Sequence, residues 1–329
     1  MEGFFMTKKS GVFDVDFEDF TLIESEKKNE KMDVESRSIE NALDIVIRQM
    51  IASGYRKRTT DDYRRIVSNF RKVQGINNLS DITAETIYGW LDKMNVANQT
   101  KLTRLKSLKS FLSKCFNNGW YVSKFWASIN VKVDKKIKQG TKPSDIQLLL
   151  SLIDTKTFTG LRDATAILTM YKTGIRINTL GQLEEKHIDF TEGILKLDGD
   201  VLKNHKYLKL PLDNQLLHLY RVLIKQNNKV RNHYCQDNSF IFISYKGKSL
   251  NTKSTNNAIS KQLTKYSKEF GLKNINAHAI RRAYAKNLLD KGANIALISK
   301  ALGHSNLEVT TQYLDLDVDE VANNLRDYL

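Results

Sequence analysis

The side chains best suited to chemistry lie in the C-terminal half of the chain and combine arginine, histidine and tyrosine. Arginine binds two phosphate oxygens at once through its planar guanidinium and keeps its charge. Histidine beside a phosphate supplies hydrogen bonds or transfers a proton, and a phenol leaves more easily than an alkyl alcohol, so a covalent intermediate stays reversible. Together these groups suit the metal-free opening of a phosphodiester. They are Arg176, His278, Arg281, His304 and Tyr313.

Two of the motifs lie at the ends of predicted helices. Arg176 comes two residues after Gly174, at the end of an apolar stretch that predicts a helix. His278 and Arg281 are three positions apart. On a helix, or at its first turn, side chains with this spacing share one face. We therefore expect this histidine and arginine to point in the same direction.

A tight turn is predicted around His304. Gly303 can end one helix in the left-handed conformation, and Ser305 with Glu308 forms a capping box that begins the next. The backbone at His304 then has little freedom. Tyr313 follows nine residues after His304, on the new helix or just past its end.

The four motifs resemble those of the tyrosine recombinase, or phage integrase, family. The first arginine of that family follows a Thr-Gly-Leu-Arg-like turn, which is similar to Thr173-Gly174-Ile175-Arg176. Its His-x-x-Arg pair is matched by His278 and Arg281, and its Leu-Gly-His motif by residues 302–304. In the family the nucleophile follows that motif after nine residues, as Tyr313 does here, and the 23 positions from the second arginine to the second histidine are also typical.

The resemblance also implies a catalytic lysine on a β-hairpin, eight residues before a Val-Pro-Leu-like strand end. Lys203 stands eight residues before Pro211 and is the best match, with Lys206 as a rival on the same hairpin. One position departs from the family pattern. Thr179 lies three residues after Arg176, where an acidic residue is usual. Either Thr179 replaces that residue by hydrogen bonding, or support comes from elsewhere, or the enzyme is slower.

The resemblance implies a mainly α fold with a small antiparallel sheet, in which a helical core-binding domain precedes a mixed α+β catalytic domain. It implies a site-specific recombinase that cleaves and rejoins double-stranded DNA through a 3′-phosphotyrosyl intermediate, without a metal, ATP or any other cofactor. Tyr313 would attack, the two arginines would clamp the phosphate, the two histidines would hydrogen-bond it, and Lys203 would be the general acid. Two alternatives stay open: a type IB topoisomerase or telomere resolvase, and a catalytically silent DNA-binding protein of the same fold.

The resemblance further implies partners beyond the recombination sites in DNA. A homo-tetramer would hold two sites, with the C-terminal tail, residues 314–329, exchanged between protomers or packed on its own domain. Val318, Val321 and Leu325 form an apolar stripe on that tail. Accessory proteins are further candidate partners. Integration, transposition and dimer resolution are all compatible with the motifs, and the unusual acidic N-terminus favours a mobile genetic element.

The composition agrees with a DNA-binding protein. The 329 residues carry a net charge of +15, and a polyanion is the partner that such an excess of Lys and Arg favours. A membrane surface is the weaker alternative, because no basic amphipathic helix with an aromatic face stands out. No run of 18 apolar residues predicts a membrane span. The two cysteines are too few for a disulfide framework, so we expect a reducing cytoplasm. The Lys-, Asn- and Ile-rich composition favours a bacterial protein, which would lie on the nucleoid when bound.

Charge and apolar periodicity divide the chain into four parts. Residues 1–38 hold ten acidic and six basic side chains and are expected to form a flexible arm. Residues 39–131 repeat apolar residues every three or four positions, which predicts four helices, the last beginning at Asn98. Residues 132–143 contain five lysines and are expected to form a basic linker. Residues 144–329 would be the catalytic domain.

Several basic side chains are candidates for DNA contact, although those of the fourth helix could equally form a solvated outer face. They are Lys101, Arg104, Lys106, Lys109, Lys135 and Lys136. In the catalytic domain the pattern predicts helices and a small sheet. Helices are expected at 145–153, at 161–171 and from about 253 onwards, and strands at 194–197, 207–210 and 240–243.

Overall fold

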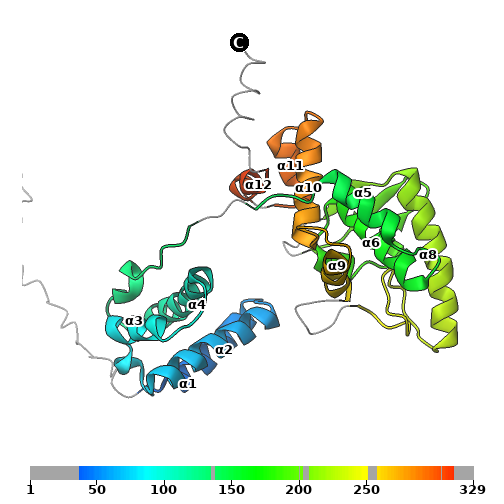
Figure 1. Ribbon diagram of the computed structural model, residues 1–329. Helices are drawn as coiled ribbons and strands as arrows, with labels where there is room; N and C mark the ends of the chain where they lie inside the picture. Colours follow the sequence, from blue (N-terminus) through cyan, green and yellow to red (C-terminus); the bar gives the residue numbers. More distant parts are fainter. Residues whose placement is uncertain are drawn as a thin grey trace, which may run out of the picture. The chain divides into compact units, whose positions relative to one another are not determined.

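The protein divides into two compact units, Met1–Lys135 and Lys136–Leu329 (Figure 1). The computed structural model describes residues 37–134, 138–199, 201–202, 207–250, 258–304 and 306–314, apart from the side chains of residues 312 and 313. Nearly all of the predicted arm, 1–38, and of the predicted tail, 314–329, lies outside these ranges. None of the helices within them has both the length and the apolar character needed to cross a membrane.

Four α-helices and two 3-10 turns are described in the first unit, and the prediction of four helices is confirmed. The helices enclose a single apolar core, in which the rings of Phe70 and Trp90 meet edge to face with centroids 5.3 Å apart. A left-handed glycine, Gly75, ends the second helix at φ 67°. The elements are α1 (Ile39–Ala52), α2 (Lys57–Gln74), η3 (Leu79–Asp81), α3 (Ala84–Asp92), α4 (Asn98–Asn117) and η4 (Phe125–Ser128).

The second unit is mainly helical with a small antiparallel sheet, as predicted. Its three strands pair in the order β1-β2-β3, and β2 aligns Leu195 with Leu210 of β3. The helices are α5 (Pro143–Leu152), α6 (Phe158–Thr173), α7 (Ile177–Leu180), α8 (Asn214–His233), α9 (Ala258–Glu269), α10 (Ala277–Asp290), α11 (Ile295–Leu302) and α12 (Leu307–Leu314). The remaining elements are η5 (Glu185–His187), β1 (Ile188–Asp189), β2 (Ile194–Leu197) and β3 (Leu208–Pro211).

The prediction of a strand at 240–243 was wrong. This segment makes only isolated bridges, from Glu184 to Phe240 and from Ile243 to Ser249. Its apolar side chains at 241–243 are completely buried, so the run reflects burial and not strand pairing. A short apolar run cannot be distinguished by its pattern from a buried extended loop. The third strand is instead β1, which has only two residues and too little pattern to be predicted.

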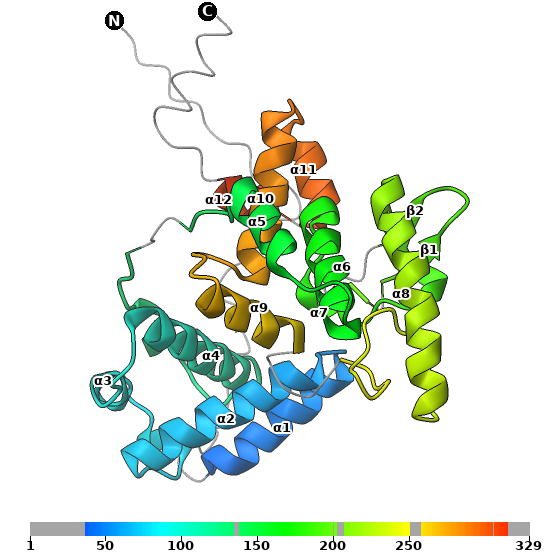
Figure 2. The same ribbon diagram turned by 45° about the vertical axis from the view of Figure 1, so that its right-hand side comes forward.

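Helix α6 is the central element of the second unit. It lies between α10 and α8 (Figures 1 and 2), and from Ala164 to Met170 every side chain is buried. The helix ends at Gly174, which has φ 63°. A Cβ atom at Gly174 would lie 2.2 Å from Cδ1 of Tyr284 on α10, so only glycine permits this close approach. The end of α6, and therefore the residues that follow it, are fixed against α10.

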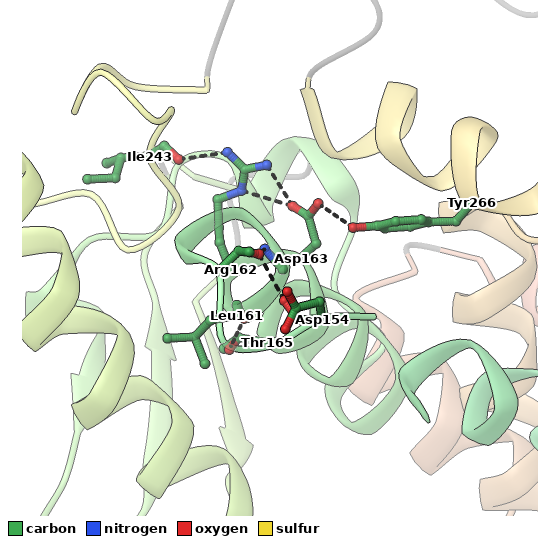
Figure 3. A network of polar contacts seen from close by, with 9 residues as sticks. Asp154, Leu161, Arg162, Asp163, Thr165, Ile243 and Tyr266 are labelled. Carbon is green, nitrogen blue, oxygen red and sulfur yellow. Dashed lines mark hydrogen bonds and ion pairs between the residues drawn. The ribbon is translucent and has the colours of Figure 1, made fainter. Parts of the chain in front are cut away.

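A buried polar network fastens α6 to two other segments of the unit (Figure 3). Nε and Nη2 of Arg162 both donate to Oδ1 of Asp163, at 2.9 and 2.7 Å. Nη1 of Arg162 donates to the carbonyl oxygen of Ile243 at 3.1 Å. The Tyr266 hydroxyl, on α9, donates to the other Asp163 carboxylate oxygen at 3.1 Å. The network thus holds both the extended segment at 240–243 and α9 on the central helix.

Replacing Asp163 with alanine should lower the free energy of unfolding by about 3–5 kcal/mol, because it leaves the buried Arg162 charge without its carboxylate. Tyr266→Phe is the matched comparison, since it removes one hydrogen bond to the same carboxylate and should cost about 1 kcal/mol. Urea unfolding followed by circular dichroism measures both losses. Equal losses in the two variants would show that the ion pair does not hold this part of the fold.

Candidate active site

Two arginines from distant parts of the sequence meet at the end of α11. Arg176 is the N-cap residue of α7, and its Nη1 atom donates to the carbonyl oxygen of Leu302 at 3.5 Å. Arg281, in the second turn of α10, is only 2% exposed. Its Nη2 atom donates to the same Leu302 oxygen at 2.5 Å, and its Nη1 atom donates to the carbonyl oxygen of Gly174. The last carbonyls of a helix have no partner within the helix and favour cations. The end of α11 can therefore bind both guanidiniums.

His304 lies in the predicted tight turn directly after α11. Gly303 has φ 60°, and its N–H donates to the carbonyl oxygen of Lys300 at 2.9 Å. The N–H of His304 donates to the carbonyl oxygen of Ser299, also at 2.9 Å. This pair of hydrogen bonds is a Schellman motif, which fixes the backbone on both sides of the glycine. The prediction of a left-handed helix end at Gly303 is confirmed, while Ser305, part of the predicted capping box, lies outside the described residues.

The His304 ring is held from both sides. Its Nε2 atom lies 3.3 Å from Nη2 of Arg281, and its Nδ1 atom lies 2.9 Å from the Thr310 hydroxyl oxygen. Arginine can only donate, so Nε2 must accept and the proton of the neutral ring sits on Nδ1, which donates to Thr310. Thr310 is completely buried on α12 and was not predicted from the sequence. The one feature of the sequence that could have indicated Thr310 is its position three residues before Tyr313 on the predicted helix.

Tyr313 belongs to α12, although its side chain lies outside the described residues. The helix is anchored on both sides of this position. Thr310 holds His304, and Leu314 is 3% exposed in a small apolar cluster with Tyr284 and Leu302. The backbone that carries Tyr313 is therefore attached to the turn and helices that carry the other predicted residues.

His278 is the second residue of α10, one turn before Arg281 and Arg282 on the same helix, and its side chain is exposed. Partial desolvation lowers the pKa of His278, and the charges of Arg282, Arg281, Arg176 and Lys138 lower it further. Its position on α10 puts the imidazole in the same region as Arg281. The described geometry thus brings together both predicted arginines and both predicted histidines.

The pKa of His304 is lowered to about 4, first by burial and then by the charges of Arg281 and Arg176. Both histidines of the site are therefore neutral near pH 7 in the absence of an anion. In both histidines desolvation is the largest cause of the lowered pKa, and the charges of the nearby arginines add to it. Those positive charges favour a negatively charged ligand.

The predicted general acid, Lys203, and its rival Lys206 lie outside the described residues. The structure does describe Thr179, which is 2% exposed and donates its hydroxyl hydrogen to the Val201 carbonyl oxygen at 3.1 Å. Thr179 therefore does make a hydrogen bond, which was one of the three alternatives for this position. The bond ties the start of α7 to the backbone two residues before Lys203.

The candidate DNA-contacting residues fall into three groups. Lys101, Arg104 and Lys106 lie on α4. Lys109 instead donates to the carbonyl oxygens of Ala127 and Ile129, at 2.8 and 2.9 Å, and so holds the segment around η4. Its ammonium group therefore has a structural role, and its contact with DNA stays a prediction. Residues 135 and 136, the last two candidates, lie outside the described residues. Within the described ranges no group of three or more His, Cys, Asp or Glu side chains could hold a metal ion.

Comparison with known proteins agrees with this arrangement. Residues 140–320 match the model of the phage integrase family. The tyrosine recombinase XerC of Chlamydia caviae is 28% identical over 221 residues, which cover 67% of this chain and 68% of that protein. XerC of Bacillus licheniformis is 24% identical over 295 residues, 86% of this chain and 94% of the relative.

Solved structures show the same fold at lower identity. A Tn1549 transposon integrase structure has a TM-score of 0.68 at 16% identity and covers 89% of this chain and 100% of its own. A structure of the XerH site-specific recombinase has a TM-score of 0.63 at 19% identity and covers 87% and 84% respectively. The family match spans more than half of the chain and contains the whole constellation from Arg176 to Tyr313. The chain therefore belongs to the phage integrase family, and it is a tyrosine recombinase that breaks and rejoins DNA.

Proposed function

We propose that Tyr313 is the nucleophile of a reversible transesterification on duplex DNA. Its phenolic oxygen gives up its proton, attacks the scissile phosphorus and forms a 3′-phosphotyrosyl bond, while the bond to the 5′ oxygen breaks. Lys203 gives that leaving oxygen a proton, so one proton leaves the phenol and one reaches the new 5′ hydroxyl. A 5′ hydroxyl of the partner duplex then loses its proton as it attacks the same phosphorus, and the released tyrosine takes up a proton again. One phosphodiester-type bond replaces another at each step, so no nucleotide cofactor is consumed.

The main support for this proposal is that two guanidiniums and an imidazole lie together at the end of α11. Arg176 and Arg281 both donate to the Leu302 carbonyl oxygen, and His304 lies 3.3 Å from Arg281. Carbonyl oxygens and a neutral ring leave the charge of a guanidinium intact, which carboxylate partners would not. Two such charges in a buried setting can stabilise the negative charge that builds up on non-bridging phosphate oxygens.

Double-stranded recombination sites are the proposed substrate. The net charge of +15 supports a polyanionic partner. Several structures with the same fold are DNA complexes: the Tn1549 integrase with a circular intermediate DNA, a lambda integrase dimer on a COC′ core site, and XerH on its difH substrate. We assign the helical unit, 39–131, to clamping the DNA and residues 144–329 to catalysis. Of the predicted linker, 132–143, residues 136–143 belong to the second compact unit, so the proposed link is the part before them.

We further propose that four protomers act on two sites and that each Tyr313 serves the active site of its own subunit. The contacts of Thr310 and Leu314 within one subunit support delivery from the same chain. The tail beyond Leu314 would then be free to pass to a neighbour as the exchanged segment. We also propose that the protein acts in a mobile genetic element. It would work in a bacterial cytoplasm, together with accessory proteins.

A nicked suicide substrate tests the reaction directly, because loss of the short fragment beyond the nick traps the covalent intermediate. The wild-type protein should form a covalent protein–DNA adduct, and Tyr313→Phe should form none while still binding the DNA. Arg176→Ala and Arg281→Ala should each slow adduct formation by about a hundredfold or more, as expected for loss of a stabiliser of developing negative charge. An adduct of undiminished amount in Tyr313→Phe would remove this residue from the mechanism. Relaxation of supercoils without strand exchange would favour a topoisomerase instead.

DNA binding should be accompanied by uptake of protons. A bound phosphate brings negative charge to His278 and His304 and so raises the pKa values that burial and the arginines have lowered. A group whose pKa rises on binding takes up a proton when the complex forms. The affinity for DNA should therefore increase as the pH falls from 6.5, the ordinary pKa of histidine, towards about 4, the pKa of His304 without DNA. Calorimetric titrations in buffers of different ionisation enthalpy, at about pH 6, measure the uptake. The double variant His278→Gln with His304→Gln should take up fewer protons, and an unchanged uptake would contradict this account.

A further inference from the structure

An open cleft of about 750 Å³ borders the site on the side of His278. It is formed by the segment just after the boundary between the two units, by the loop before α10 and by the first turns of α10. The described residues that line it include three basic side chains and three amides but no carboxylate. They are Lys138, Gln139, Asn274, Asn276, His278 and Arg282.

The walls of this cleft are fixed by hydrogen bonds. Asn274 has φ 60°, a conformation that few residues other than glycine adopt, and its Nδ2 atom donates to the carbonyl oxygens of Gln139 and Gly140 at 2.8 and 3.0 Å. The Thr141 hydroxyl donates to the Asn274 carbonyl oxygen at 2.9 Å, and the Thr141 N–H donates to the Ala279 carbonyl oxygen at 3.1 Å. The end of the predicted linker is therefore part of the catalytic unit and is fastened to the start of α10.

Close packing brings this segment directly against the backbone of α10. A Cβ atom at Gly140 would lie 2.9 Å from the nitrogen of Ala283 and 3.2 Å from the carbonyl carbon of Arg282. Both neighbours are backbone atoms that cannot move aside easily, so a glycine is required here. Lys138, two residues earlier and exposed, is thereby held beside the α10 turn that carries Arg282.

The two asparagine amides of the cleft make hydrogen bonds within the protein, whereas Lys138 and Arg282 contribute positive charge to its wall. Both carbonyl oxygens bound by Asn274 belong to the segment itself. Asn276 caps α10, with Oδ1 accepting from the Ala279 N–H at 3.0 Å and Nδ2 donating to Oδ1 of Asn274 at 3.3 Å. Base edges are read by such amides, but phosphates are bound by Lys and Arg. The lining of the cleft therefore fits an anion better than a base.

We propose that Lys138 and Arg282 form a second phosphate-binding site, which holds a backbone phosphate of the cleaved strand adjacent to the scissile phosphate. This inference rests on the proposed function, because His278 is common to the cleft and the active site. Successive phosphates of one strand are about 3.4 Å apart along the helix axis, so the second phosphate belongs to a nucleotide within one or two positions of the cleaved bond. Binding it would set the register of the strand, so that the correct phosphate lies between Arg176 and Arg281.

A double-mutant cycle between protein charge and phosphate charge tests this assignment. Each modified suicide substrate carries one neutral methylphosphonate. It replaces one of the two phosphates on either side of the scissile phosphate, so four substrates cover the four positions. Affinity is measured with each DNA, and adduct formation is measured in parallel. For the wild-type protein, one of these replacements should weaken binding by about tenfold, the loss expected for a charge-assisted hydrogen bond. In the double variant with Lys138→Ala and Arg282→Ala, binding to unmodified DNA should weaken by a similar factor. The same methylphosphonate should then cause little further loss of affinity.

Lys142→Ala is the matched control. It removes the same charge from the same segment, but Lys142 does not line the cleft, so the full methylphosphonate penalty should remain. Lys138→Ala alone provides a second test, because Lys138 is exposed and its loss does not threaten folding. Variants that keep the full penalty at all four positions would overturn the proposal. The proposal would also be overturned if the substitutions were coupled to changes of base pair and not to neutralisation of a phosphate.

The two readouts separate this inference from the reaction itself. Coupling in affinity without any adduct would support the second phosphate site while contradicting the proposed chemistry. Normal adduct formation without coupling at any position would contradict the second site while leaving the chemistry intact.

Discussion

The proposed active site depends on a single helix end. The carbonyl oxygen of Leu302 accepts hydrogen bonds from both Arg176 and Arg281, which are 105 positions apart in the sequence. A helix C-terminus offers unpaired carbonyls and a negative partial charge, so it can gather two cations without cancelling their charge. The helix end then turns, through Gly303, directly into His304. One turn of backbone thus positions three of the groups that a phosphate would meet.

The rest of the catalytic unit keeps that helix end in place. Helix α6 is buried on nearly all sides, and its left-handed end at Gly174 packs so closely on Tyr284 that the start of α7, with Arg176, has one position relative to α10. Thr310 connects His304 to α12, and so to the backbone of Tyr313. Desolvation at this site and the charges of its arginines lower the pKa of both histidines, and the same charges favour the binding of an anion.

Much of this could be predicted from the sequence, because the spacings of arginine, histidine and tyrosine residues and the two glycines encode local geometry. Contacts between distant segments were harder to predict. Thr310 was missed because a buried threonine has no pattern of its own. The structural role of Lys109 was missed because nothing local shows that its ammonium group binds the carbonyl oxygens of Ala127 and Ile129. The segment at 240–243 was taken for a strand because burial on every side gives the same apolar run as a sheet. The long helix α8 was not identified individually, although its ends and apolar spacing are regular.

If the proposed mechanism holds, Arg176 and Arg281 act on the same phosphate as Tyr313. A structure of the wild-type protein covalently trapped on a nicked recombination site would measure this directly, through the distances from the phosphotyrosyl oxygens to the two guanidiniums. We expect both guanidiniums within hydrogen-bonding distance of the non-bridging oxygens of that one phosphate, with His304 beside them. A phosphotyrosine bound by only one arginine, with the other still held on the Leu302 carbonyl and remote from the phosphate, would contradict the proposed mechanism.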